Sequence, residues 1–263
     1  MRSVIVIPAR IGSTRFPEKP FAMIAGKSML QRVWEIAAAT IADRVIIATD
    51  SEKIQQHAQS FGAECLMTSV ECQSGTDRVA EVARSCHFTD EIVINLQGDT
   101  PLTPPWVIDS LIKEMFACAD IELATPMIKL EGDRLIEVVR KKTAGSTSGT
   151  LVVFDKDKRA LYFSKGLIPF SRSGDTSVPR YLHLGIYAYR VDALQRLNSL
   201  PVSRLESIEK LEQLRALENG MGIQMVEVDL LGRTLVSVDS PEDAVDAEAV
   251  IQREGEVVES KVL

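Results

Sequence analysis

The sequence predicts an α/β fold in which a mostly parallel central sheet is flanked by helices. Short β-rich apolar runs alternate with longer segments of helical periodicity through the first half of the chain, which is typical of consecutive βαβ units. With 263 residues, 45% of them hydrophobic, one domain can bury roughly 70–75% of its unfolded surface. Glycine and proline together make up about a tenth of the chain, too little for a disordered or collagen-like protein.

The elements of the first 62 residues follow this alternation. Residues 4–7 are an unbroken apolar run and form the first strand. Residues 28–40 form an amphipathic helix, because their apolar side chains recur on one face. Residues 44–49 form a buried strand. Asp50-Ser51 then provides an N-cap for a helix that runs to about Phe61-Gly62.

The alternation continues to residue 127. A brief strand around 65–67 leads to a helix at 76–84 and to the apolar strand 92–96. A helix begins at Pro104-Pro105 and extends through residue 115, because proline suits the first helical turn. Residues 123–127 form the next strand. A doubly wound α/β protein is the simplest account of this order.

The middle of the chain is richer in β-structure. Residues 141–149 are small and polar, which predicts a loop. The runs 151–154 and 160–163 flank a turn and predict a β-hairpin. Residues 181–189 are another strand-rich run. These elements predict a smaller β-rich lobe beside the main sheet.

The last elements are a helix, two strands and a final helix. The helix covers residues 205–217, with leucines facing inward and charges outward. The strands lie near 224–228 and 234–238, and the final helix begins at Ser240.

Charge and composition exclude several classes of protein. The formal net charge is −7 and the pI about 5.2, which argues against a general nucleic-acid or anionic-membrane binder. No apolar run approaches the roughly 20 residues of a membrane helix, and we expect a cytoplasmic protein. Four cysteines without a C-x-x-C pair and three histidines do not suggest a zinc site.

A basic loop follows the first strand. Residues 8–20 contain Arg10, Arg15 and Lys19 together with Ser13 and a glycine. The loop lies where ligands bind in open α/β sheets, so its cations could neutralise a triphosphate. It matches neither the P-loop nor the dinucleotide fingerprint. A solvated basic loop explains the residues equally well.

Two aspartates follow predicted strands and are candidate magnesium ligands. Asp99 comes after strand 92–96, and Asp239 comes after strand 234–238. Carboxylates from separate strand ends can share a magnesium ion bound to substrate phosphates. The alternative for each is a cap, because Asp239 begins an Asp-Ser-Pro-Glu-Asp run typical of a helix N-terminus.

A polar glycine turn precedes the predicted helix 76–84. Residues 72–78 read Cys-Gln-Ser-Gly-Thr-Asp-Arg. This turn is consistent with a helix cap or with backbone amides that contact a base. Arg78 suits either a salt bridge or a phosphate.

Seven segments in register resemble the 3-deoxy-manno-octulosonate cytidylyltransferases, the CMP-Kdo synthetase family. They are Ile7-Pro8-Ala9-Arg10 with Ser13-Thr14-Arg15 and Lys19-Pro20, residues 73–78, 95–99, 160–164 with Ile168-Pro169, 183–187, 211–215 and 238–243. Each segment alone is modest, but together they extend over nearly the whole chain.

The resemblance implies a cytoplasmic, magnesium-dependent, homodimeric enzyme with a Rossmann-like nucleotidyltransferase fold. It would convert CTP and Kdo to CMP-Kdo and pyrophosphate for lipopolysaccharide biosynthesis. The resemblance also implies a single domain over residues 1–263. Residues 1–130 would bind CTP, 131–220 would bind the sugar and form the dimer, and 221–263 would return to the main sheet.

The resemblance also assigns roles to residues. Those expected at the CTP phosphates are Arg10, Ser13, Arg15 and Lys19. Those expected near the cytosine are Ala9, Ser74 and Gly75, with Arg78 as support. Asp99 and Asp239 would hold Mg²⁺. The sugar pocket would contain Gln97, Lys165, His183, Tyr187, Glu212 and Gln213. An anomeric hydroxyl attacking the α-phosphate needs charge neutralisation and in-line placement, not a covalent enzyme nucleophile.

Departures from the family pattern are concentrated in the sugar half. Thr100 replaces an acid, Lys165 replaces an arginine, Ser207 replaces a histidine, and the small-polar residues 145–150 replace the usual approach to the hairpin. Lys165 keeps the charge but loses the bidentate fork that suits a carboxylate. The 8-amino analogue of Kdo is therefore the alternative acceptor. A sialic-acid activator and a silent CTP-binding paralogue are further alternatives.

Overall fold

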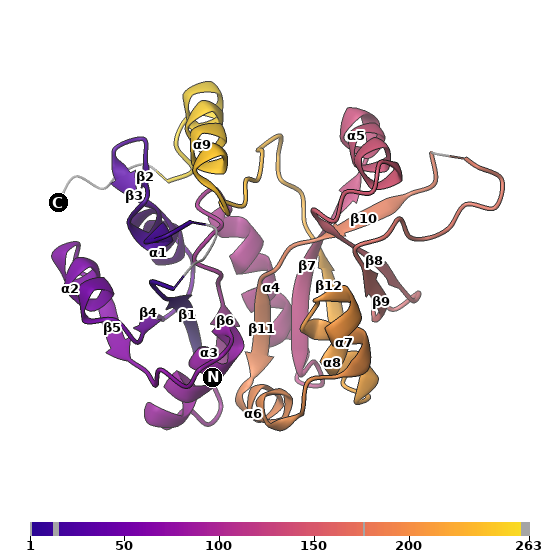
Figure 1. The fold of residues 1–263 in the computed structure, drawn as a ribbon. Helices are drawn as coiled ribbons and strands as arrows, with labels where there is room; N and C mark the ends of the chain where they lie inside the picture. Colours follow the sequence, from indigo (N-terminus) through magenta and orange to yellow (C-terminus); the bar gives the residue numbers. More distant parts are fainter. Residues whose placement is uncertain (1, 13–15, 176, 259–263) are drawn as a thin grey trace.

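The computed structural model describes residues 2–12, 16–175 and 177–258, and it confirms the α/β class (Figure 1). Its main sheet has ten strands in the order β5-β4-β1-β6-β11-β7-β10-β8-β9, with β12 paired to β7. The parallel part consists of β5 (Glu64–Met67), β4 (Arg44–Thr49), β1 (Ser3–Ala9) and β6 (Ile92–Asn95).

The second part of the sheet is built around the long strand β7. Its strands are β7 (Leu123–Leu130), β8 (Thr150–Phe154), β9 (Ala160–Ser164), β10 (Arg180–His183), β11 (Tyr187–Arg190) and β12 (Gln224–Glu227). Strand β12 is parallel to β7, whereas the pairings of β10 and β11 and the predicted hairpin β8–β9 are antiparallel. Strand β11 lies between β6 and β7 and so joins the two parts.

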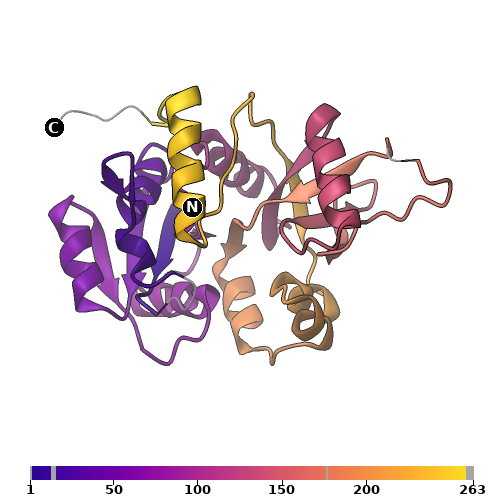
Figure 2. The same cartoon turned by 45° about the horizontal axis from the view of Figure 1, so that its top comes forward.

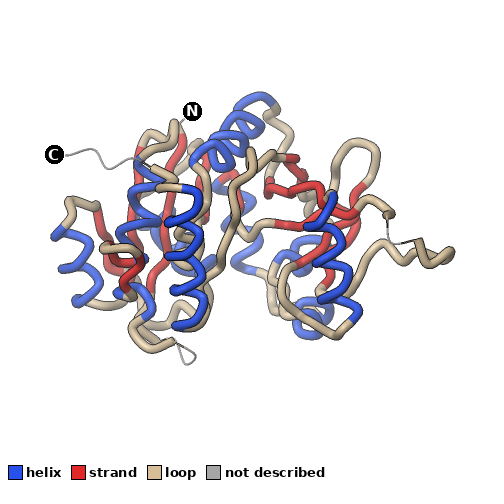
Figure 3. Tube along the Cα trace, turned by 90° about the horizontal axis from the view of Figure 1, so that it is seen from above, coloured by secondary structure: helices blue, strands red, loops and turns tan. Residues whose placement is uncertain are grey.

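Helices cover both faces of the sheet (Figure 3). The predicted helices appear as α1 (Met29–Ala38), α2 (Glu52–Ser60), α3 (Gly75–Ser85), α4 (Pro105–Ala117) and α9 (Pro241–Glu254). Ser28, Ser51, Ser74 and Ser240 cap four of them, each accepting a backbone N–H bond, which supplies a partner that the first helical turn lacks. Within the described residues, no helix has the length and apolar composition needed to cross a bilayer.

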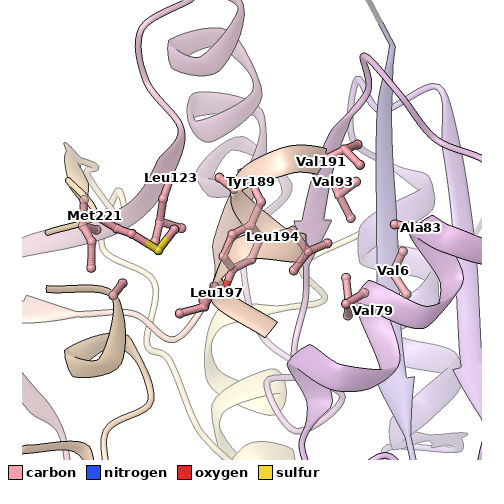
Figure 4. Close-up of a cluster of buried hydrophobic side chains, with 14 of the residues drawn as sticks. Val6, Val79, Ala83, Val93, Leu123, Tyr189, Val191, Leu194, Leu197 and Met221 are labelled. Carbon is pink, nitrogen blue, oxygen red and sulfur yellow. The ribbon is translucent and has the colours of Figure 1, made fainter. Parts of the chain in front are cut away.

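The alternation of side chains along β1 separates the two main clusters of the core. Val4 and Val6 belong to one cluster and Ile5 and Ile7 to the other, as the two-residue period of a strand requires. Figure 4 shows the first cluster, in which Leu194 and Tyr189 lie between Val93 and Leu123. This cluster therefore packs the two parts of the sheet against each other.

Three sequence predictions differ from the structure, and two helices were not predicted. The predicted helix 205–217 is broken into α7 (Arg204–Glu209) and α8 (Gln213–Glu218), because Lys210 adopts a left-handed conformation with φ 56°. The predicted strand 234–238 is irregular. Residues 141–143, predicted as loop, end the helix α5 (Gly132–Thr143). That helix and α6 (Val191–Ser199) were not predicted.

The C-terminal segment returns to the first part of the sheet. After β12 the chain crosses over, and α9 lies beside the first-half elements (Figure 2). Helix α9 contacts the small hairpin of β2 (Met23–Ile24) and β3 (Lys27–Ser28). The Val238 N–H donates to the Asp99 carbonyl at 2.9 Å. The start of α9 is thereby fixed next to the loop that follows β6.

Candidate active site

A cavity of about 370 Å³ opens where β1 and β6 end and α3 begins. This is the edge of the sheet where open α/β proteins bind ligands. The predicted residues that line the cavity are Ala9, Arg10, Lys19, Ser74, Gly75, Arg78, Gln97, Asp99 and Asp239. The structure thus brings together the described residues of the predicted CTP and magnesium sites. Ser13 and Arg15 lie outside the described residues.

Lys19 lies between the two predicted magnesium ligands. Its Nζ is 3.1 Å from Asp99 Oδ2 and 3.0 Å from Asp239 Oδ1. The lysine belongs to the short 3₁₀ helix η1 (Lys19–Phe21), and its side chain is only 14% exposed. Three segments far apart in sequence therefore place one cation and two carboxylates at one end of the cavity.

Asp239 is not the cap of α9, because its neighbours make the capping hydrogen bonds. Ser240 is the N-cap of α9, and Asp243 completes the capping box by accepting from the Ser240 backbone N–H. Asp243 also accepts from the Asp239 N–H at 2.8 Å. The capping function thus belongs to Ser240 and Asp243, which leaves the Asp239 carboxylate directed at Lys19.

The carboxylates of Asp99 and Asp239 are oxygen ligands of the kind that Mg²⁺ prefers. Both approach the same ammonium group within 3.1 Å, so their oxygens face a common point that holds positive charge. The described residues contain no cluster of three or more candidate metal ligands. Two carboxylates are sufficient for Mg²⁺, which usually takes its other ligands from water and substrate phosphates.

The start of α3 forms another wall of the cavity. The Ser74 and Asp77 side chains make a capping box around the first turn. A Cβ on Gly75 would lie 3.1 Å from Pro8 Cγ, so a larger residue would require the two to move apart by a few tenths of an ångström. The Arg10 guanidinium approaches the same turn and donates to the Gln73 carbonyl at 3.4 Å. The helix N-terminus, with its partial positive charge, therefore faces the cavity beside Arg10.

Arg78 borders the cavity but is engaged in a buried salt bridge. The residue is 2% exposed. Its Nη2 donates to Asp50 Oδ2 at 2.8 Å, and its Nη1 donates to the Thr68 hydroxyl. The structure therefore shows the salt-bridge alternative, with Arg78 joining α3 to the end of β4.

We expect Arg78→Met to lower the free energy of unfolding by about 2 kcal/mol, because it leaves Asp50 without its cation. Urea unfolding measures the change. The control is Arg84→Met at the exposed end of the same helix, where the expected loss is about 0.5 kcal/mol or less. Equal losses for the two variants would contradict the structural role of Arg78.

The remaining predicted sugar residues lie outside the cavity lining. Those described residues are Lys165, His183, Tyr187, Glu212 and Gln213. The rings of His183 and Tyr187 are 5.5 Å apart, and Gln213 Nε2 is buried without a hydrogen-bond partner among the described residues. A buried donor of this kind costs about 1–3 kcal/mol unless it is satisfied. Lys165 lies within electrostatic range of His183, and Glu212 lies within electrostatic range of Tyr187, so we treat these residues as a second polar cluster.

Burial shifts the pKa values of this second cluster. It raises the pKa of the Glu212 carboxyl, and a hydrogen bond from the Thr76 hydroxyl only partly offsets this. Burial also raises the pKa of Tyr187, which the charge of Glu212 raises further. Burial lowers the pKa of Lys165, whereas the nearby charges of Glu209 and Asp239 raise it. Lys165 is therefore within electrostatic range of both clusters.

Sequence reasoning missed Glu209, which supports Lys165. The Glu209 carboxylate accepts from the Lys165 N–H at 2.9 Å and from the Ser164 hydroxyl at 2.8 Å. Lys142, also missed, donates its Nζ to the Lys165 carbonyl at 2.6 Å and to the Gly149 carbonyl at 2.7 Å. Neither residue has a local sequence signal, because each acts on a segment at least seven residues away.

His183 gives the second cluster a pH-dependent stability. Burial lowers the pKa of His183 from 6.5 to about 3, so the folded protein keeps this ring neutral. The unfolded chain takes up a proton as the pH falls below 6.5. The contribution of His183 to stability is therefore complete above pH 6.5 and is lost between pH 6.5 and 3.

We expect the wild type to lose about 2 kcal/mol of stability between pH 8 and pH 5 through this residue, because the midpoint of 6.5 is 1.5 pH units above pH 5. His183→Gln, which retains a donor for the Thr125 hydroxyl beside the ring, lacks this component. Urea unfolding at both pH values checks the difference. Parallel pH dependence of wild type and variant would contradict a buried neutral His183.

Cys72 lines the cavity but is unsuited to be a nucleophile. Burial and its hydrogen bond to Glu81 raise the pKa of the thiol to about 12. The reactive thiolate is therefore scarce at neutral pH. The cavity is better suited to electrostatic catalysis by Lys19 and its carboxylates than to covalent catalysis.

Comparisons with known proteins identify the family of the chain. The model of the cytidylyltransferase family matches residues 4–223. A 3-deoxy-manno-octulosonate cytidylyltransferase of Maricaulis maris is 48% identical over 259 residues, covering 98% of this chain and all of that protein. One of Desulfatibacillum aliphaticivorans is 43% identical and covers 96% and 99%. The solved structure of a CMP:2-keto-3-deoxy-manno-octonic acid synthetase complexed with CTP has a TM-score of 0.86 at 36% identity, covering 97% and 100%.

Proposed function

The chain belongs to the cytidylyltransferase family, and from this premise we propose that it transfers the cytidylyl group of CTP to 3-deoxy-manno-octulosonate (Kdo). The products are CMP-Kdo, a precursor for lipopolysaccharide, and pyrophosphate. The observation that carries the proposal is the placement of Lys19 between Asp99 and Asp239 in a cavity that also contains the N-terminus of α3. We further propose that the enzyme is a magnesium-dependent homodimer in the cytoplasm.

The described cavity residues have separate proposed roles toward the base, the phosphates and the metal of bound CTP. We assign Ser74 and Gly75 at the start of α3, together with Ala9, to contacts with the cytosine, because all three line the cavity. Arg10 and Lys19 neutralise the triphosphate. Asp99 and Asp239 hold the magnesium ion, which when bound supplies further positive charge to the phosphates.

The residues of the protein stabilise the transition state mainly by neutralising negative charge and by positioning the two substrates. In-line attack by the anomeric hydroxyl of Kdo at the α-phosphate breaks the bond to pyrophosphate, and negative charge grows on the leaving group. The side chain of Lys19 is 14% exposed and borders the cavity. Because it is partly shielded from water, its ammonium stabilises the negative charge on the leaving pyrophosphate more strongly than it would in bulk solvent. Tyr187, Glu212 and Gln213 hold the acceptor sugar from the adjacent cluster.

Lys165 favours the 8-amino analogue of Kdo as a second candidate acceptor. Its side chain is partly buried beside Glu209, whose carboxylate receives two hydrogen bonds from this segment. An ammonium group on the acceptor would suit the acidic side of that pair. The lysine ammonium is a point charge without the bidentate fork of arginine, so it selects the orientation of a sugar carboxylate less strongly.

Pyrophosphate release by the purified protein tests the proposal. CTP, UTP and ATP are each supplied with Mg²⁺ and with Kdo, 8-amino-Kdo, a sialic acid or no acceptor. We expect release with CTP and Kdo. Release only with the amino sugar would assign the departures at Thr100 and Lys165 to acceptor choice. CTP binding without release for every acceptor would support a silent paralogue and overturn the proposal.

A further inference from the structure

A chain of hydrogen-bonded polar side chains leads from the first turn of α3 to the cavity. Gln97 Nε2 donates to Asn95 Oδ1 at 3.0 Å, and Asn95 Nδ2 donates to the Thr76 hydroxyl at 3.3 Å. The Thr76 hydroxyl also lies close enough to the Glu212 carboxyl and the Tyr189 hydroxyl to lower the pKa of both groups against the rise that burial causes. Of these residues, Gln97 lines the cavity. The hydrogen-bonded chain therefore extends from Thr76, outside the cavity lining, to the Gln97 amide inside it.

The interior members of this chain are almost completely buried. Asn95 is 0% exposed and Thr76 is 5% exposed. Asn95 lies in the middle of the sheet on β6, directly opposite Tyr187 of β11, and Thr76 lies in the first turn of α3. Buried polar groups must pair with one another. Neither side chain can turn to water without leaving its partner unsatisfied.

The donors and acceptors of the three side chains fix which way each hydrogen bond runs. The Thr76 hydroxyl oxygen accepts from the Asn95 amide nitrogen, because only the nitrogen of an amide side chain can donate. Asn95 then has Nδ2 directed to Thr76 and Oδ1 directed to Gln97. Gln97 must present Nε2 to Asn95. Its Oε1 has no donor among the described residues and remains for a ligand.

The Gln97 amide is also confined by packing. A Cβ on Gly75 would lie 3.6 Å from both Nε2 and Oε1 of Gln97. The amide therefore lies against the first residue of α3, close to the turn that borders the cavity. Its orientation depends on the hydrogen bond to Asn95, because this is the bond that distinguishes its nitrogen from its oxygen.

We infer that Thr76 and Asn95 are positioning residues, which hold the Gln97 side chain with Oε1 directed into the cavity to accept from a sugar hydroxyl. The inference rests on the proposed function for the identity of the substrates. Thr76 anchors the far end of these hydrogen bonds in the first turn of α3. Neither Thr76 nor Asn95 is itself a lining residue of the cavity.

A double-mutant cycle tests whether Thr76 acts through Gln97. Thr76→Val removes the hydroxyl at nearly constant volume, and Thr76→Ser keeps it. We expect Thr76→Val to raise the KM of one substrate about 5- to 10-fold, the loss of one well-oriented hydrogen bond, with kcat changed less. Thr76→Ser should stay within about 2-fold. In a Gln97→Ala background, Thr76→Val should have no further effect on KM.

The two substrates are distinguished by their separate KM values. An increase confined to the acceptor means that Gln97 accepts from a hydroxyl of the sugar acid. An increase confined to CTP means that the hydroxyl belongs to the ribose. Equal effects of Thr76→Val with and without Gln97, or equal defects in Thr76→Val and Thr76→Ser, would overturn the inference in favour of a purely structural role.

A spectroscopic readout separates this inference from the proposed function. The side-chain NH₂ signals of Gln97 are identified by their loss in Gln97→Ala. We expect their hydrogen exchange to accelerate in Thr76→Val and to remain slow in Thr76→Ser, whether or not the protein turns over Kdo. Unchanged exchange in Thr76→Val would contradict the positioning role. Absence of turnover in the wild type would contradict only the proposed function.

Discussion

Asp99→Asn should lower kcat by about 10³-fold or more while leaving the fold intact. Asparagine has almost the same shape, but it removes a negative charge from the point at which Asp99, Asp239 and Lys19 converge. Its amide nitrogen would direct hydrogens at a position that holds a cation. The main backbone contact of Asp99, its carbonyl bond to the Val238 N–H, is unaffected. Steady-state turnover with saturating CTP, Kdo and Mg²⁺ measures the loss.

Asp246→Asn is the matched control. Asp246 is an exposed aspartate on α9, the helix that follows Asp239, and its replacement makes the same change in net charge. We expect kcat within about 2-fold of the wild type for this variant. Circular dichroism and urea unfolding of Asp99→Asn should resemble the wild type. Full activity of Asp99→Asn would refute the assignment of Asp99 to the metal site.

Lys19→Met should lower kcat/KM for CTP by about 10²- to 10³-fold. Methionine retains much of the side-chain length but removes the ammonium that neutralises the two carboxylates and, in the proposed reaction, the departing pyrophosphate. Initial rates over a range of CTP concentrations separate the two contributions. A raised KM reports lost ground-state binding, and a lowered kcat reports lost stabilisation of the leaving group.

Lys53→Met controls for the loss of a positive charge near this segment. Lys53 on α2 pairs with Glu18, lies 4.7 Å from the Phe21 ring and has a side chain 55% exposed. It therefore lies beside η1 but does not line the cavity. We expect kcat/KM within about 2-fold for Lys53→Met. Similar defects in Lys19→Met and Lys53→Met would indicate a general charge effect instead of a specific site.

The sequence predicted elements best where periodicity and caps agree. Strand β4 and the helix α2 begin and end within about one residue of their expected positions, because Ser51 caps the helix as its side chain suggests. The break between α7 and α8 was not predictable, since Lys210 is not a residue typical of the left-handed conformation. Its conformation depends on the tertiary packing of the two short helices.

Only part of the candidate site could be recognised from local patterns. The basic loop and Asp99 follow apolar strands, so their position at one edge of a parallel sheet was predictable. Asp239 could equally have been a cap, and only the structure shows that Ser240 and Asp243 take that role. The chain from Thr76 through Asn95 to Gln97 depends on contacts between α3 and β6. No spacing within either segment indicates it.

The most direct test of the account is product analysis of one reaction mixture containing the protein, CTP, Kdo and Mg²⁺. Mass spectrometry and ³¹P NMR would quantify the nucleotide sugar and pyrophosphate together. We predict that CMP-Kdo and pyrophosphate form in equal amounts, and that Asp99→Asn forms neither at a comparable rate. Consumption of CTP to free CMP or inorganic phosphate without a sugar conjugate would contradict cytidylyl transfer in this cavity.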